Sequence, residues 1–302
     1  MNHINHAFLI TAYRDPGSLL SLLEQISKVP NAKAFLAVDL NQKCNILSYV
    51  DNITNYCPTL NHSVYKFAMR WGGGSHYGAM MHLMQSAMEE GYSHFHTLTG
   101  QCRLIYPATI FTKFFELNST KIFMEHFQLP RHGWSGEGGL ARMKYYHWHD
   151  IINLRPYRAL RAFDRFCVSV QRAIGINRLS VNQYYGGSGY YSVEKEAADL
   201  LLTDYRKNSI HYRHSFCAEE VIPQTVLCNS SLMERGLIQN CNLRYINWQK
   251  KHGETPAILD EKDLKSMVAG KYLFARKFDS RFSTDINIPL PEELAHQWLI
   301  EN

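Results

Sequence analysis

The fold class follows from the stretch AFLITAYRDPGSLLSLLEQISKVPNAKAFLAVD, residues 7–39. It opens with an uncharged run, 7–12, and closes with a second apolar run, 34–38, that ends at Asp39. Between the two runs, over 18–26, leucines recur at helical spacing. Short uncharged runs on either side of an amphipathic helix are typical of buried parallel strands joined by a crossover helix. The sequence therefore predicts an α/β fold that begins with a strand, helix and strand.

Asp39 stands at the carboxyl end of the second predicted strand. In open α/β sheets, ligands bind in the crevice beyond the carboxyl ends of the parallel strands. Asp39 is therefore a candidate for a contact to a nucleotide base or ribose. An acid that simply ends a strand is an equally good interpretation.

The composition is that of a globular protein with a sizeable core: 302 residues, 45% hydrophobic, with a formal net charge of +5. That charge is too small to indicate nucleic acid as a partner, but it fits an anionic ligand or an anionic membrane surface. Seven cysteines without a Cys-x-x-Cys pair indicate free thiols in a reducing compartment. With no long apolar stretch and no signal-like N-terminus, we expect a cytoplasmic protein, peripheral on a membrane at most.

A glycine-rich segment, 71–75, precedes a predicted helix over 79–88. Such glycines can let the backbone approach a phosphate, but the segment matches neither the Walker pattern nor the dinucleotide pattern. The chain also contains no Asp-x-Asp pair, which would hold a divalent cation on a sugar nucleotide. If a diphosphate is bound, something other than such a metal must neutralise it.

Two segments rich in aromatic residues and glycine, 133–149 and 184–193, are typical of loops on which a sugar ring stacks. Loops that plug the core would have the same composition. The first segment contains His147 and His149, yet no acid or cysteine stands at metal-ligand spacing from them. We therefore do not expect a zinc site there.

Residues 154–178 alternate arginines with apolar residues, and Asp164 is the opposing acid. This pattern predicts a basic amphipathic helix that would lie on an anionic membrane surface. A solvated helix at the edge of the domain would show the same pattern. The arginines are Arg155, Arg158, Arg161, Arg165, Arg172 and Arg178.

Two adjacent acids, Glu219 and Glu220, come just before Pro223 and an apolar run. Because proline lacks an N–H, it is tolerated in the first turn of a helix, so a helix should begin near Glu219 or Glu220. The helix dipole would hold a carboxylate there ionised, as a general base requires. Helix capping is the alternative role. Further along, Arg244 and Lys277 stand inside apolar runs, where burial is costly unless the cation meets an anion. These two are the strongest phosphate-ligand candidates.

Taken in order, these motifs resemble the core-2/I-branching β-1,6-N-acetylglucosaminyltransferases and their peptide xylosyltransferase relatives, glycosyltransferase family 14. The resemblance runs from His6 to about Arg281. Each motif alone is weak, but eight in the right order are specific. They are Ala7–Ile10 with Arg14–Pro16, Val38–Asp39, Trp71–Gly73, Leu98–Gln101, Gly187–Tyr191, Ala218–Glu220 with Gln224–Thr225 and Asn229–Ser230, Arg244–Trp248, and Leu273–Asp279.

The resemblance implies one GT-A-like catalytic domain over 1–302, with a Rossmann-like nucleotide-binding half, 1–110, and an acceptor-binding and catalytic half, 111–302. It implies an inverting transfer from a UDP-sugar, with UDP-GlcNAc favoured, and no metal ion or other cofactor. The expected acceptor is a hydroxyl of a glycan or lipid-linked glycan. The family's animal members carry a membrane anchor and disulfides, and their absence here favours a bacterial enzyme of surface polysaccharide synthesis, such as lipopolysaccharide or capsule.

Carried over residue by residue, Glu220 matches the family's general base, and Arg244 and Lys277 match cations expected on the UDP diphosphate. Two fixed cations could replace a metal ion as the diphosphate leaves. Asp39 and Arg14 are expected on the uridine and its ribose. Contacts to the sugar or the acceptor are expected from Trp71, Gly100, Gln101, Trp134, Ser188, Tyr190 and Glu219.

Cys102 departs from the family pattern, because the family usually has an acid at this position. The contact expected from that acid to the donor or acceptor sugar is therefore not assigned to Cys102. Two alternatives follow: a transferase for UDP-xylose or another UDP-sugar, and a non-catalytic glycan- or nucleotide-binding protein that kept the fold. Release of free UDP would separate an enzyme from a binding protein.

Overall fold

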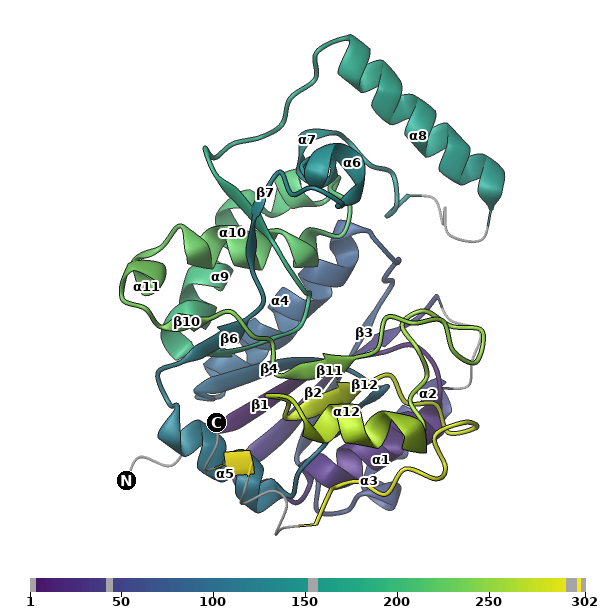
Figure 1. Ribbon diagram of the computed structural model, residues 1–302, viewed down its shortest axis with the longest axis vertical. Coiled ribbons are helices and arrows are strands. Elements are labelled where there is room, and N and C mark those ends of the chain that lie inside the picture. Colours follow the sequence, from purple (N-terminus) through teal and green to yellow (C-terminus); the bar gives the residue numbers. More distant parts are fainter. Residues whose placement is uncertain (1–3, 42–45, 152–156, 292–297, 300–302) are drawn as a thin grey trace.

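The computed structural model describes residues 4–41, 46–151, 157–291 and 298–299. Its main feature is a seven-stranded sheet with the order β10-β6-β9-β4-β1-β2-β3 (Figure 1). The strands are β1 (His6–Ala12), β2 (Ala32–Asp39), β3 (His62–Phe67), β4 (His94–Thr99), β6 (Ile122–Met124), β9 (Tyr191–Glu194) and β10 (Ile238–Gln239). The sheet thus contains strands from both predicted halves of the chain.

The centre of the sheet is parallel. Strand β1 lies between β2 and β4 and is parallel to both, so that Phe8 stands opposite Ala34 on one side and His96 on the other. Helix α1 (Pro16–Ile26) connects β1 to β2, as the sequence predicts. Strand β9 is antiparallel to β4 and β6. The expected GT-A-like α/β class with a Rossmann-like first half is confirmed.

Helices cover both faces of the sheet (Figure 1). Side chains of β1 alternate between two apolar clusters: Phe8 and Ile10 pack with α1 and α5 (Ala108–Leu117), whereas Ala7 and Leu9 pack with α4 (Gly74–Glu89) and α9 (Lys195–Tyr212). A strand buried on both faces needs apolar residues at every position. This explains why the strand runs in the sequence are continuous rather than alternating.

Two smaller sheets stand beside the main one. The first has the order β11-β12-β5, with β11 (Arg244–Ile246) parallel to β12 (Phe274–Arg276) and β5 (Cys102–Leu104) antiparallel to it. The second pairs β7 (Phe127–Leu129) with β8 (Tyr184–Gly186). The remaining short elements are α2 (Ile46–Val50), α3 (Ile53–Tyr56), α6 (Ser135–Gly138), α7 (Ala141–Lys144), α10 (Ile222–Cys228), α11 (Ser231–Glu234), α12 (Leu264–Val268) and the 3₁₀ turns Ala218–Glu220 and Glu261–Asp263.

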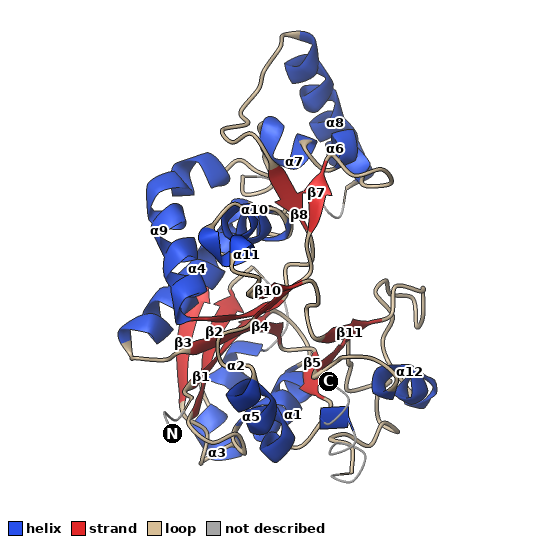
Figure 2. Ribbon diagram, turned by 60° about the vertical axis from the view of Figure 1, so that its left-hand side comes forward, coloured by secondary structure: helices blue, strands red, loops and turns tan. Residues whose placement is uncertain are grey.

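The predicted basic helix is α8 (Arg158–Ala173), which projects from one end of the molecule, away from the main sheet (Figure 2). No residue of α8 is buried. The expected span 154–178 was too long, because the helix ends at Ala173 and Gly175 adopts a positive φ of 77°. Residues 154–156 of that prediction, Arg155 among them, lie outside the described residues. In the part of the chain that the structure describes, no helix is both long and apolar enough to cross a bilayer.

Candidate functional site

The carboxyl ends of the central parallel strands bring together three predicted site residues. Arg14 follows β1, Asp39 ends β2, and Gln101 follows β4. The buried Gln101 connects Arg14 to the C-terminal part of the chain: its Oε1 accepts from Arg14 Nε at 3.0 Å, and its Nε2 donates to the Phe278 carbonyl at 3.0 Å. Gly100, beside it, packs closely on Leu19. This is the edge at which α/β folds bind ligands.

Asp39 is buried and holds the loop beyond β2. Its Oδ1 accepts from the backbone N–H groups of Asn41 at 3.0 Å and Met69 at 3.1 Å. The residue therefore shapes this end of the sheet, and its contact to uridine stays a prediction.

Glu219 and Glu220 stand in a 3₁₀ turn, Ala218–Glu220, that precedes α10. Cys217 enters the turn in the left-handed region, with φ 49°. The α-helix begins at Ile222, with Pro223 in its first turn, and not at either acid as predicted. Pro223 occupies the second helical position, which the first-turn preference of proline also allows. The two acids consequently lie outside the helix and take their properties from side chains around them.

Glu220 is paired with Arg142 from α7. Arg142 Nη1 donates to Glu220 Oε2 over 2.5 Å. The guanidinium also lies over the ring of Trp134 at 4.3 Å and near that of Phe216 at 5.4 Å. Burial raises the pKa of Glu220, and Arg142 only partly opposes this. The expectation of a carboxylate held ionised by the helix dipole is therefore corrected: Arg142 supplies the stabilising charge.

Glu219 faces a different cation, His76 at the start of α4. His76 Nδ1 lies 3.5 Å from Glu219 Oε1. Burial works to raise the pKa of Glu219, but the His76 contact outweighs it and leaves that pKa below its ordinary value. Burial likewise opposes the charged imidazole, but Glu219 and then Asp39 raise the pKa of His76. The two neighbouring acids thus have pKa values shifted in opposite directions.

Residues 188–190 connect the acid pair to the cations of the C-terminal part. Ser188 is fixed by Gln224, whose Nε2 donates to its carbonyl at 2.7 Å. A Cβ on Gly189 would lie 3.1 Å from the Glu219 side chain. Next to it, the ring of Tyr190 is covered by the Arg276 guanidinium at 4.5 Å. Glycine at 189 therefore lets the segment run directly against Glu219.

Lys277 and Arg14 share one carboxylate, that of Glu254. Lys277 Nζ donates to Glu254 Oε2 at 2.7 Å, and Arg14 Nη1 donates to Glu254 Oε1 at 3.1 Å. The hydrogen bond from Lys277, followed by that from Arg14, lowers the pKa of Glu254 to about 2. The Lys277 side chain is 5% exposed and that of Glu254 is 33% exposed, so the carboxylate covers the amine from outside. A bidentate anion sits between two cations in the same way as a diphosphate would.

Arg244 is buried in the interior, with 2% of its surface exposed. Its Nη atoms donate to the carbonyls of Thr97, Tyr191 and Asn242 and to the Ser192 hydroxyl. Burial lowers the pKa of Arg244 to about 9. The predicted need for an anion is therefore met here by neutral oxygens, and the direct contact to a diphosphate stays a prediction.

The two tryptophans take different positions. Trp71 is 56% exposed and meets the Phe216 ring edge-on at 5.7 Å. Trp134 is wedged between two glycines: a Cβ on Gly139 would lie 2.3 Å from its ring and one on Gly186 would lie 2.6 Å from it. The Trp134 ring thereby supports the guanidinium of Arg142, the partner of Glu220, whereas the Trp71 side chain is largely exposed.

The sequence was compared with protein families and solved structures. The profile described as "Branch: Core-2/I-Branching enzyme" matches residues 6–268. The chain belongs to the Core-2/I-branching enzyme family. The family expected from the motifs is confirmed. The match ends at residue 268, before β12, and therefore does not include Lys277.

No curated protein matches the sequence of this Core-2/I-branching enzyme. Solved structures with a related fold are distant. The S. aureus TarS fragment 1–349 with UDP-GlcNAc is 11% identical with a TM-score of 0.31, over 40% of this chain and 34% of that one. The same fragment with UDP is 10% identical with a TM-score of 0.32, over 58% and 50%. A putative glucose-1-phosphate thymidylyltransferase from Bacillus anthracis with sucrose is 10% identical, with a TM-score of 0.37, over 78% and 85%.

Four functional candidates were not found from the sequence: His76, Arg142, Glu254 and Arg276. None of them belongs to a local pattern, because each meets its partner through the tertiary fold; Arg142, for example, precedes Glu220 by 78 positions. Only Arg276 carried a signal, since it adjoins Lys277 within the same apolar run.

Proposed function

We propose that this Core-2/I-branching enzyme transfers a sugar, with N-acetylglucosamine favoured, from a UDP-sugar to a hydroxyl of a glycan or lipid-linked glycan. The transfer inverts the anomeric centre and needs no metal ion. One observation carries the proposal: Arg142 orients the Glu220 carboxylate, and residues 188–190 run from the neighbouring Glu219 side chain to Arg276, which precedes Lys277. Family membership supports the donor class.

Glu220 is the proposed general base. It takes the proton from the acceptor hydroxyl, whose oxygen forms the new bond to the anomeric carbon while the bond from that carbon to the UDP oxygen breaks. The side chain is 36% exposed, so an acceptor can reach it. Burial raises the pKa of Glu220 above its ordinary value, which makes the carboxylate a stronger base, and Arg142 keeps it in the ionised form. Glu219 keeps its proposed place on the acceptor side.

The leaving UDP gains negative charge, and fixed cations stabilise it in place of a metal ion. Lys277 and Arg14 are proposed to bind the diphosphate after displacing Glu254. This moves Arg14 from the expected uridine contact to the phosphates, because it shares an anion with Lys277. Arg276 has no carboxylate at ion-pairing distance among the described residues, and it adds charge beside Tyr190. Arg244 is proposed to stabilise the diphosphate through its positive charge from the interior of the protein. Asp39 remains proposed for the contact to uridine.

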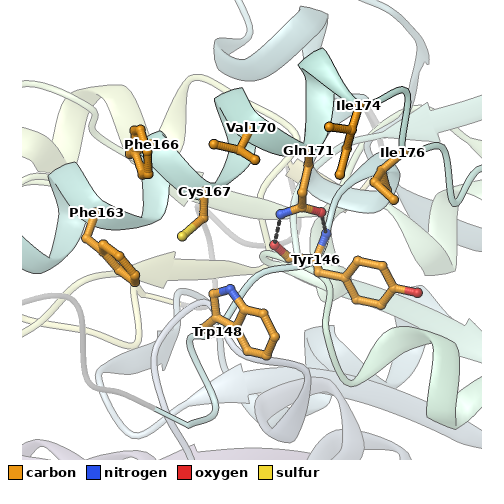
Figure 3. Close-up of a pocket in the computed structure, with 9 residues that line it drawn as sticks. All are labelled: Tyr146, Trp148, Phe163, Phe166, Cys167, Val170, Gln171, Ile174 and Ile176. Atoms are coloured by element: carbon orange, nitrogen blue, oxygen red, sulfur yellow. Dashed lines mark hydrogen bonds between the residues drawn. The ribbon is translucent and has the colours of Figure 1, made fainter.

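Helix α8 is proposed to bring the enzyme to the inner face of the bacterial cytoplasmic membrane, where lipid-linked precursors of surface polysaccharide are built. Its apolar side chains lie along one face, toward Tyr146 and Trp148 (Figure 3). They enclose a shallow apolar pocket of about 510 Å³, and Phe166 and Ile174 are 63% and 69% exposed. The helix also carries Arg158, Arg161, Arg165 and Arg172. Exposed aromatic residues next to arginines suit an anionic bilayer interface.

The test is a donor screen by release of free UDP. The purified enzyme is incubated with UDP-GlcNAc, UDP-xylose, UDP-glucose and UDP-galactose, each with simple glycosides as acceptors and with EDTA present. We expect UDP release to be fastest from UDP-GlcNAc and unchanged by the chelator, with Glu220→Gln as the blank. A different fastest donor would correct the sugar. Dependence on added Mn²⁺ would overturn the cation argument, and UDP binding without any release would favour a non-catalytic binding protein.

A further inference from the structure

A group of potential metal ligands lies outside the proposed active site. His147 and His149 follow α7, and Asp164 projects from α8. One ligand atom from each of the three side chains lies within 4.8 Å of the other two. A zinc site was not expected here from the sequence, because the acid stands on α8 and not at short spacing from the two histidines.

Each of the three side chains buries a polar atom that no described residue satisfies. These atoms are His147 Nδ1, His149 Nδ1 and Asp164 Oδ1. The side chains of His147 and Asp164 are 8% and 14% exposed, so both lie largely away from bulk solvent. Buried polar atoms normally have hydrogen-bond partners, and three unsatisfied atoms in one place require an explanation.

The geometry around His147 orients it as a ligand. Its Nε2 lies 3.0 Å from the Ala141 carbonyl and therefore carries the proton that it donates there. The lone pair is then on Nδ1, which faces Asp164 Oδ2 at 3.6 Å. A backbone carbonyl that fixes the far nitrogen is the usual second contact of a metal-bound histidine. His149 is held in turn by the Phe216 ring, with the ring centroids 4.6 Å apart.

We propose that His147, His149 and Asp164 bind one zinc ion, with water as the fourth ligand. Two imidazoles and a carboxylate are a set that zinc prefers, and its bonds of about 2.0–2.1 Å place tetrahedral ligand atoms about 3.4 Å apart. The distance of 3.6 Å between His147 Nδ1 and Asp164 Oδ2 is close to that value. A hydrogen bond between His147 and Asp164 would leave His149 Nδ1 unsatisfied, whereas one ion can be bound by an atom from each of the three side chains.

The ion would fasten α8 to the body of the enzyme. Apart from its apolar face, α8 makes few polar contacts with the rest of the described chain. Gln171 pairs with the backbone N–H and carbonyl of Tyr146, and Arg172 pairs with Glu137. Figure 3 shows the two hydrogen bonds between Gln171, near the C-terminal end of α8, and Tyr146. Phe216 separates the proposed zinc site from Arg142 and Glu220. The ion is therefore a structural one, and the site is independent of the proposed transfer.

The experiment measures zinc binding to the full chain, purified without a histidine tag and freed of metal by dialysis against a chelator. Calorimetric titration with ZnCl₂ should give one equivalent. Asp164→Asn and His149→Gln should each bind at least 100-fold more weakly, because each removes a ligand that zinc requires. The exposed His132→Gln, on the same segment, serves as the control and should bind as the wild type does.

Two further readouts keep the result interpretable. Zinc should raise the melting temperature of the wild type and not that of Asp164→Asn, provided circular dichroism shows both to be folded. Co²⁺ bound in place of zinc should give the visible absorption of a tetrahedral nitrogen and oxygen site. Absence of stoichiometric binding, or undiminished binding by both ligand variants, would overturn the proposal. A change in UDP release is not among the criteria, so failure of the proposed function would leave this test unaffected.

Discussion

Arg142 Nη1 donates to Glu220 Oε2 over 2.5 Å, so the proposed base is held by a cation from a separate part of the chain before any acceptor arrives. The pairing fixes the direction of the carboxylate. Arg142 also favours the ionised form of Glu220, whereas burial favours the protonated form.

Replacing the base should remove transfer and leave donor binding intact. Glu220→Gln keeps the shape of the side chain and cannot accept a proton, so kcat should fall about 10²- to 10⁴-fold. UDP affinity, measured by calorimetry, should remain near that of the wild type. The exposed Glu234→Gln on α11 is the matched control. Full turnover by Glu220→Gln would remove this residue from the mechanism.

Removing the cation beside the base should shift the pH profile. A base must be deprotonated to act, so kcat falls as the pH drops through the pKa of Glu220. Arg142 favours the charged form, so its loss in Arg142→Met should move this acid limb to higher pH. Arg142→Lys, which keeps the charge, should show a smaller shift. An unmoved limb in Arg142→Met would show that the cation does not tune the base.

Glu254 should compete with the donor for Lys277 and Arg14. Glu254→Gln removes the competing charge, so the affinity for UDP should rise about three- to tenfold, the range expected of a partly exposed ion pair. Lys277→Met should weaken UDP binding instead. The exposed Glu261→Gln, seven positions along the chain, is the control. If Glu254→Gln bound UDP more weakly, the carboxylate would be a donor ligand rather than a competitor.

The His76 and Glu219 pair should stabilise the fold over a limited pH window. The pKa of His76 is raised, so its contribution is complete below 6.5 and is lost as the pH rises through the folded value. The pKa of Glu219 is lowered, so its contribution is complete above 4.5 and is lost as the pH falls through the folded value. A double-mutant cycle with His76→Gln and Glu219→Gln should give a coupling free energy of about 1 kcal/mol between pH 4.5 and 6.5. The same coupling at pH 9 as at pH 5.5 would contradict the assignment.

The basic helix should bind anionic lipid. Arg158, Arg161 and Arg165 replaced together by glutamine should reduce binding to phosphatidylserine vesicles, with each arginine near the surface worth about 1 kcal/mol, or roughly fivefold. A variant with the same charge change elsewhere, at Lys28, Lys113 and Lys207, is the control, since all three side chains are exposed on other helices or loops. Equal sedimentation with vesicles by both variants would remove α8 as the membrane contact.

The first half of the fold was predictable because its signals are local. The runs that became β1 and β2 are continuous and apolar, and Asp39 ends β2 as expected. Buried strands require such runs whatever the rest of the chain does. The helix start near Glu220 was misplaced by two residues, since the first-turn preference of proline allows more than one position.

The site was only partly predictable, because its charges are paired by tertiary contacts. No local pattern connects Arg142 with Glu220, Glu254 with Lys277, or Asp164 with the two histidines. The burial of Arg244 among carbonyls was missed for a related reason. The rule that a buried cation needs an anion does not distinguish a carboxylate from several well-placed neutral oxygens.

The wedge of Trp134 between Gly139 and Gly186 makes two positions without reactive atoms sensitive to mutation. A single methyl group at either would displace the indole, and with it the surface against which Arg142 rests. Alanine at Gly139 or Gly186 is therefore expected to leave the protein at normal levels in the cell but to reduce its activity. The reason is that Arg142 would no longer hold the Glu220 carboxylate in place. A mutational scan scored for activity alone would assign part of the catalytic centre to two glycines, one after α6 and one at the end of β8, that act only through the indole.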